Sequence, residues 1–263
     1  PPQPPLHYET QPPLAPPTAA PLAFAAPQVE PAAAPKSFLP VQDLETEGVS
    51  GCRLYMTRIS LNCVAIQLLL TEGNVIHEVV DVDLAKGEHR TPQFKALNPL
   101  MQVPVLQDED GTVVWESNAI LRYICNTFSL DDSFYPTSPA ERARLEMALD
   151  WRQTTLYPHI ARAAYPALGF SQDFAGVEAG MAELAKDLKL LLSFWLHDRS
   201  FICGARPSIA DLAIAMPLLM VEATAMPLSA GLQQYLARMA REFEAWDNLT
   251  APFLTYLDSQ KGH

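Results

Sequence analysis

The segment from Asn98 to Ile124 constrains the fold more than any other part of the chain. A loop ends in Val103-Pro104, and two short apolar runs follow on either side of the turn-forming pair Asp110-Gly111. A peptide bond before proline adopts the cis form at low cost, so the Val103–Pro104 bond is a candidate cis bond. An amphipathic run begins at Glu116-Ser117, where a hydroxyl and free backbone N–H groups can hold an anion. The segment therefore predicts a strand, a tight turn, a second strand and a helix.

The residues before this segment predict a strand, a helix and a second strand. Residues 52–60 are typical of a strand running into a loop, and residues 62–72 carry apolar side chains at helical spacing. Residues 75–82 form the second strand pattern, and a short helix is expected around residues 92–97. A strand–helix–strand order implies a right-handed crossover and a parallel strand pair. We therefore expect an α/β domain over residues 50–130, with the order β-α-β-α-β-β-α.

The second half of the chain predicts an all-helical domain over residues 138–258. The expected helices span residues 140–156, 183–196, 208–220 and 233–246. This half shows no strand pattern, which favours a separate all-α domain. Ser208 and Asp211 precede an apolar run at the spacing of a capping box, so one helix is expected to begin there.

Composition and charge exclude several functional classes. The net charge of −12 argues against a nucleic-acid partner, because such a surface needs clustered Lys and Arg. No apolar run approaches the length needed to cross a bilayer. The four cysteines are widely separated, so we expect neither a disulfide framework nor a bound metal.

Residues 1–48 form a Pro/Ala-rich extension that differs from the rest of the chain. Thirteen of the 24 prolines lie at or before Pro40. This composition favours extended polyproline II and cannot build a core, so the extension is either a linker or a segment that lies on a partner or on the globular body of the same chain. The chain starts at Pro1 and not at Met, so an upstream segment was either cleaved, as an organellar presequence is, or not included. We expect an organelle interior, mitochondrion or plastid, in preference to the cytoplasm.

The frame around residue 60 resembles theta-like, serine-type members of the glutathione S-transferase family. In those proteins a Leu-Tyr strand runs into a loop serine, followed by x-Pro-Cys-Arg at the start of a helix. Here the same frame reads Leu54-Tyr55-Met-Thr-Arg-Ile-Ser60-Leu61-Asn62-Cys63-Val64. The resemblance covers roughly residues 52–256. It implies the glutathione transferase fold, an α/β thioredoxin-like N-terminal domain followed by an all-α C-terminal domain.

The resemblance implies a catalytic role for Ser60 and glutathione as co-substrate. A hydroxyl donated to the sulfur and a nearby helix N-terminus both stabilise a thiolate, which is a minor species of a free thiol at neutral pH. The positions implied to contact glutathione are His89, Gln102, Val103, Pro104, Glu116 and Ser117. The positions implied to line the electrophile site are Trp151, Gln153 and Tyr157. The alternative interpretation gives these residues structural roles only: a helix cap at Ser60, a solvated loop histidine at His89 and a helix cap at Glu116-Ser117.

Two departures from the family pattern keep more than one function open. Asn62 and Val64 stand where the family has proline and arginine, and loss of a proline from a first helical turn is expected to loosen the loop. The first hypothesis is a transferase, homodimeric as a free enzyme, that joins glutathione to a small electrophile. The second is a transferase-fold accessory subunit of a larger, organellar assembly, held to other subunits through residues 1–48, with weak or no catalysis. A glutathione-dependent isomerase or dehalogenase is a third alternative.

Overall fold

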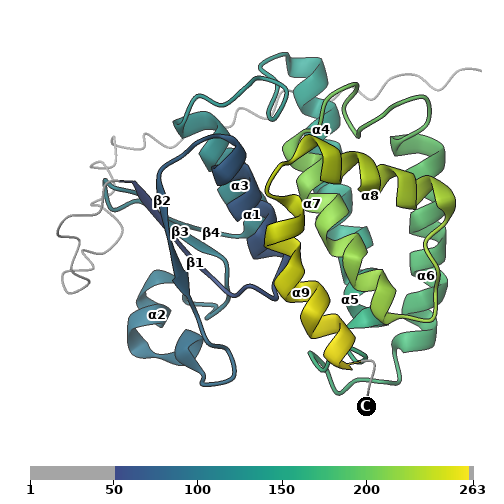
Figure 1. Ribbon diagram of the computed structural model, residues 1–263, viewed down its shortest axis with the longest axis horizontal. Coiled ribbons are helices and arrows are strands. Elements are labelled where there is room, and N and C mark those ends of the chain that lie inside the picture. Colours follow the sequence, from purple (N-terminus) through teal and green to yellow (C-terminus); the bar gives the residue numbers. More distant parts are fainter. Residues whose placement is uncertain (1–50, 261–263) are drawn as a thin grey trace, which may run out of the picture. The chain divides into compact units, whose positions relative to one another are not determined.

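The computed structural model describes residues 51–260, which contain a four-stranded sheet followed by helices (Figure 1). The strands are β1 (Cys52–Met56), β2 (His77–Asp81), β3 (Val105–Gln107) and β4 (Val113–Trp115). Their order in the sheet is β2-β1-β3-β4. β1 and β2 are parallel, as the crossover predicts, and the other two pairs are antiparallel. The predictions for residues 1–48 lie outside the described residues.

Helices cover both faces of the sheet, and the alternation of side chains along β1 explains why. The helices of this part of the chain are α1 (Leu61–Glu72), the short 3₁₀ turn η1 (Glu88–Arg90), α2 (Pro92–Leu97) and α3 (Ser117–Thr127). Leu54 and Met56 face the large core that contains α1 and α3. Tyr55 points to the other face and meets Phe94 of α2 edge-on, with 6.4 Å between ring centroids. Figure 1 shows α2 on the opposite side of the sheet from α1 and α3.

The helices after Pro139 pack against α1 and α3. They are α4 (Pro139–Trp151), η2 (Arg152–Leu156), α5 (Tyr157–Ala164), α6 (Val177–Leu190), η3 (Leu191–Trp195), α7 (Ile209–Leu218), η4 (Leu219–Ala223), α8 (Ala230–Glu242) and α9 (Trp246–Gln260). Every residue of α7 is buried, and this helix contacts α1, α3 and α4. In Figure 1 the yellow α9 runs beside α1, which it contacts. The predicted fold class, an α/β domain followed by helices alone, is confirmed. None of the helices within residues 51–260 is long and apolar enough to span a membrane.

The predicted capping box at Ser208 and Asp211 is confirmed. The buried Asp211 carboxylate accepts from the Ser208 N–H (2.9 Å), from the Ile202 N–H (2.8 Å) and from the Tyr235 hydroxyl (2.9 Å). These bonds fix the start of α7, the central helix of the helical region. A capped helix start is worth about 1 kcal/mol.

Two helix predictions are wrong at their ends. The helix expected over 140–156 continues to Ala164 through η2, a π-helical turn in which the Tyr157 N–H bonds the Arg152 carbonyl. Pro158 has no N–H to donate, and the wider turn lies directly before it. The single helix expected over 233–246 is in fact α8 and α9, because Phe243 is extended and buried between them. Most of α9 was not predicted.

Candidate active site

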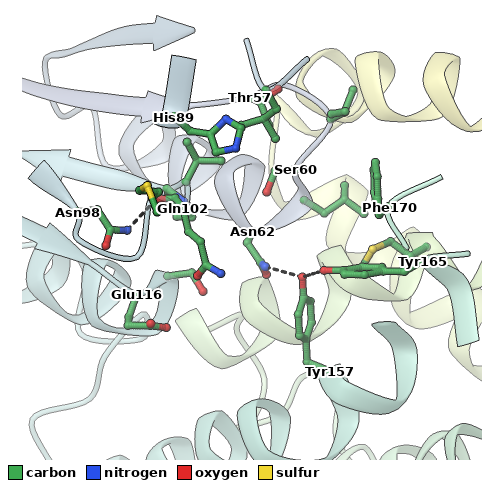
Figure 2. Close-up of a pocket in the computed structure, with 18 of the residues that line it drawn as sticks. Thr57, Ser60, Asn62, His89, Asn98, Gln102, Glu116, Tyr157, Tyr165 and Phe170 are labelled. Carbon is green, nitrogen blue, oxygen red and sulfur yellow. Dashed lines mark hydrogen bonds between the residues drawn. The ribbon is translucent and has the colours of Figure 1, made fainter. Parts of the chain in front are cut away.

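A cavity of about 480 Å³ lies between the sheet domain and the helical region. Its walls come from the start of α1, the loop before β3, the start of α3 and the junction of α4 with α5 (Figure 2). Nine residues selected from the sequence line it: Ser60, His89, Gln102, Val103, Pro104, Glu116, Ser117, Gln153 and Tyr157. The fold therefore brings together positions that lie up to 97 residues apart, from Ser60 to Tyr157.

Ser60 is the N-cap residue of α1, and its hydroxyl does not cap the helix. Its carbonyl accepts from the N–H groups of Cys63 (2.9 Å) and Val64 (3.0 Å), so the helix begins directly after it. The first N–H groups of a helix have no partner within the helix and carry a positive partial charge. The cavity wall at Ser60 therefore offers a hydroxyl and the positive end of a helix to a bound anion.

The neighbouring protein thiol does not compete for that role. Cys63 is fully buried, and this burial raises the pKa of its thiol to about 11, although a hydrogen bond with Ser60 acts in the opposite direction. Cys63 therefore remains a neutral thiol near pH 7. A thiolate at this end of the cavity has to come from a bound molecule.

The loop before β3 presents an unpaired stretch of backbone to the cavity. The Val103–Pro104 bond is cis, as predicted. Asn98, 2% exposed, donates to the Gln102 carbonyl (2.8 Å) and accepts from the Leu100 N–H (2.9 Å), which holds the loop in shape. Within residues 51–260 no backbone hydrogen bond is made by the N–H or C=O of Val103. These two groups are available to an extended ligand backbone.

Glu116 and Ser117 occupy the start of α3. Glu116 has φ of 71° and ψ of 114°, a conformation that non-glycine residues rarely adopt and that is found most often at functional sites. Its side chain is exposed and does not cap the helix. Ser117 follows as the first residue of α3, where free N–H groups favour an anion. A carboxylate and an anion site thus lie side by side, suited to a zwitterionic ligand group.

His89, in η1, adds a hydrogen-bond donor to the cavity wall. Arg90 Nε donates to His89 Nε2 at 3.2 Å, so the neutral imidazole carries its proton on Nδ1. This Nδ1 atom is buried and has no partner within the described part of the chain. Figure 2 shows the His89 ring among the lining side chains, so the imidazole forms part of the cavity wall.

The structure does not bring Trp151 to the cavity. Its indole packs against Trp195, with 5.5 Å between ring centroids, as part of the helical core. Trp151 ends α4 one residue before the π-helical turn, and that turn sends Arg152, Gln153 and Tyr157 to the cavity in its place. The predicted role of Trp151 in the electrophile site is corrected accordingly.

A buried arginine lies where the two parts of the fold meet. Arg152 is 2% exposed, and its guanidinium donates to the Ala213 carbonyl (3.1 Å), to Gln153 Oε1 (2.6 Å) and to Asn62 Oδ1. These acceptors are neutral, and no carboxylate in residues 51–260 forms an ion pair with Arg152. Burial lowers the pKa of Arg152, but a guanidinium remains charged at neutral pH. The cavity therefore borders a buried positive charge, which the Glu116 carboxylate favours at longer range without forming an ion pair with it.

Sequence reasoning missed several lining residues, among them Asn98, Tyr165, Phe170 and Met220. Asn98 opens the segment that leads to Pro104 but was given no role, and the other three belong to no motif, so no sequence signal marks them. Asn62 was noted only as a lost proline, although its side chain bonds both Arg152 and Tyr157 across the fold. No cluster of metal-ligating side chains is found in the portion that the structure describes.

The comparisons with known proteins agree with this geometry. Residues 50–126 match the family model described as glutathione S-transferase, N-terminal domain. The chain is 33% identical over 195 residues to human glutathione S-transferase theta-1, an alignment covering 72% of this chain and 78% of that protein. It is 32% identical over 178 residues to glutathione S-transferase T1 of Arabidopsis thaliana, covering 65% and 72%. The apo form of human glutathione-S-transferase T1-1 superposes with a TM-score of 0.72 at 29% identity, covering 79% of this chain and 91% of that one.

Proposed function

The chain belongs to the glutathione S-transferase family, and on this basis we propose that it is a theta-like transferase that joins the thiolate of glutathione to a small electrophile. The observation that carries the proposal is the position of Ser60. Its hydroxyl, which does not cap the helix, and the start of α1 line the same cavity as the groups suited to glutathione. Within residues 51–260 no observation favours the accessory-subunit alternative.

The cradle at β3 and α3 suits the backbone and the γ-glutamyl group of glutathione. In the proposal, the Val103 N–H and C=O pair with the cysteinyl backbone beside cis Pro104. The Glu116 carboxylate binds the γ-glutamyl amine, while the Ser117 hydroxyl and the start of α3 hold its carboxylate. Gln102 and His89 then lie on the wall available to the remaining carboxylate.

The thiol bound in this way lies at the end of the cavity formed by Ser60. The thiol gives its proton to water, and the Ser60 hydroxyl donates to the sulfur and stabilises the anion. The partial positive charge at the start of α1 favours the same anion. The sulfur attacks an electrophile held on the opposite wall, where Tyr157 and Phe170 come from the helical region (Figure 2). Gln153, of the same region, also lines the cavity.

Conjugation kinetics with Ser60 variants test this role. We expect Ser60→Ala to lower kcat/KM for a model electrophile at least about tenfold, which corresponds to about 1.4 kcal/mol of transition-state stabilisation. Ser60→Thr keeps a hydroxyl at a helix N-cap and serves as the matched control, retaining most of the activity. An alanine variant as active as the wild type would remove Ser60 from the mechanism.

We further propose that the free enzyme is a homodimer, since family members pair across a two-fold axis through the N-terminal domain of one subunit and the helical domain of the other. Light scattering on the purified chain is expected to give twice the chain mass. A monomer mass would contradict this proposal and leave the one for Ser60 standing.

A further inference from the structure

The start of α1 carries no positive side chain near Ser60. Val64 stands where the family has arginine, and its side chain is 1% exposed in the core. No residue of α1 is basic. Arg58, the basic residue nearest to Ser60 in the sequence, is exposed and forms an ion pair with Asp81 at 2.7 Å. A cation for this end of the cavity therefore comes from another part of the fold.

Arg152 brings such a cation from the helical region. It lies in the π-helical turn η2, is 2% exposed and lines the same cavity as Ser60. Its guanidinium donates to Asn62 Oδ1, although 90 residues separate the two along the chain. Asn62 belongs to the first turn of α1, directly after Ser60-Leu61. The buried charge of Arg152 thus contacts the helical turn at which a bound thiolate is expected.

Asn62 holds the guanidinium in this position. It begins a chain of hydrogen-bonded side chains, in which its Nδ2 donates to the Tyr157 hydroxyl at 2.8 Å and that hydroxyl lies 2.6 Å from the Tyr165 hydroxyl. Figure 2 shows this chain next to Ser60. Because only the amide nitrogen donates, the bond to Tyr157 leaves Oδ1 to accept from Arg152. The side chain of proline, the family residue at this position, can make neither bond.

Neutral groups surround the rest of the guanidinium. It donates to the Ala213 carbonyl at 3.1 Å and to Gln153 Oε1 at 2.6 Å, and it lies 4.2 Å from the centroid of the Tyr157 ring. The exposed Glu116 carboxylate favours the charge only at longer range. Water screens a buried charge less than an exposed one. The site is therefore arranged to attract an anion that enters the cavity.

We propose that Arg152 provides the glutathione thiolate with the positive charge that α1 lacks at Val64, and that Asn62 is the positioning residue that keeps this charge at the start of α1. The two departures from the family pattern are then one exchange. The charge has moved from α1 to the helical region, and the proline position has changed to hold it. This inference rests on the proposed transferase function and adds a residue of the helical region to the stabilisation of its nucleophile.

The test measures the pKa of the glutathione thiol bound to the purified full chain, from the ultraviolet absorbance of the thiolate as the pH is raised. Arg152→Gln keeps amide donors and removes the charge, and we expect it to raise this pKa by about 1. Arg152→Lys keeps a charge and is expected to raise the pKa by less than half of that. Asn62→Ala keeps Arg152 but removes its hold, and is expected to raise the pKa by about 0.5.

Two further variants complete the test. Arg152→Met is the second neutral variant, because an unbranched apolar side chain in place of a buried charge often preserves stability. Urea unfolding checks that each variant is folded. Arg58→Gln is the matched control, since it removes a cation that is close to Ser60 in the sequence but exposed and outside the cavity lining. We expect this control to change the pKa of the bound thiol by less than about 0.2.

The pH dependence of kcat separates a charge effect from a structural one. Removing the cation raises the pKa of the bound thiol, so the thiolate fraction falls at a pH below this pKa and is restored above it. We expect kcat of Arg152→Gln for a model electrophile to be about tenfold lower at a pH below both pKa values and to approach the wild-type value above both. A merely displaced side chain would lower kcat equally at every pH.

An unchanged thiol pKa in Arg152→Gln or Arg152→Met, or a change no larger than that of Arg58→Gln, would overturn the inference. A loss of activity that is the same at every pH would overturn it as well, and an Asn62→Ala variant with the wild-type thiol pKa would refute the positioning role of Asn62. In these cases the proposed transferase function stands. A wild type that does not bind glutathione would overturn the inference and the proposed function together.

Discussion

Asn62 is expected to stabilise the protein by joining the sheet domain to the helical region. Its side chain accepts from Arg152 and donates to Tyr157, residues 90 and 95 positions further along the chain. Asn62→Ala removes both bonds and leaves both partners in place. Because Arg152 is 2% exposed, bulk water cannot take over the acceptor role without opening the contact between the two parts.

The magnitude follows from the two bonds. A hydrogen bond from a charged donor contributes about 1.5–3 kcal/mol, and a neutral one contributes about 0.5–1.5 kcal/mol. We therefore expect Asn62→Ala to lower the free energy of unfolding by about 2–4 kcal/mol. That is a large share of the stability of an ordinary domain, which is about 5–15 kcal/mol.

Urea unfolding, followed by tryptophan fluorescence, measures this loss. Asn62→Asp is the matched control, because it keeps an acceptor for Arg152 and places a negative charge in direct contact with the guanidinium. We expect Asn62→Asp to be at least as stable as the wild type, and to be less active because its charge opposes a thiolate near Ser60. A loss below about 0.5 kcal/mol for Asn62→Ala, or equal losses for both variants, would refute the bridging role.

Three further predictions follow from the site and the core. Glu116→Gln is expected to raise KM for glutathione about tenfold with little change in kcat, because it removes the charge paired with the γ-glutamyl amine; steady-state kinetics check this. Burial raises the thiol pKa values to about 11 for Cys52, Cys63 and Cys203 and to about 12 for Cys125. Thiolate is therefore scarce at pH 8 and increases toward pH 11, so a disulfide reagent is expected to label the native protein slowly at pH 8 and all four cysteines after unfolding; fast native labelling would contradict the buried thiols. Ser208→Ala is expected to cost about 1–2 kcal/mol in urea unfolding, since it removes the cap of α7, and an unchanged midpoint would contradict this.

Local signals explain why much of the fold could be predicted. The strand patterns at residues 52–60 and 75–82, the turn at Asp110-Gly111 and the Ser208–Asp211 box each act within a few residues of chain. These signals depend on residues that are close together in the sequence, so they can be recognised without knowing how the helices pack. The continuation of the helix from Tyr157 to Ala164 and the end of α8 at Phe243 could not be predicted in this way. A helix passing Pro158 depends on the π-helical turn before it, and the end of α8 depends on the burial of Phe243 beside Phe134, at 6.3 Å between ring centroids.

Through its resemblance to the glutathione transferase family, the sequence by itself indicated which residues would form a ligand cradle, and Ser60, Pro104 and Glu116-Ser117 all line the cavity. It did not determine what faces that cradle. The chain from Asn62 to Tyr157 and Tyr165, and the Arg152 charge beside it, exist only once α1 packs next to the α4–α5 junction. The π-helical turn there turns Trp151 into the core and Arg152 to the cavity, a choice set by packing across some 90 residues. Periodicity along one helix carries no record of such long-range contacts, so only the tertiary structure decided the chemistry of the electrophile wall.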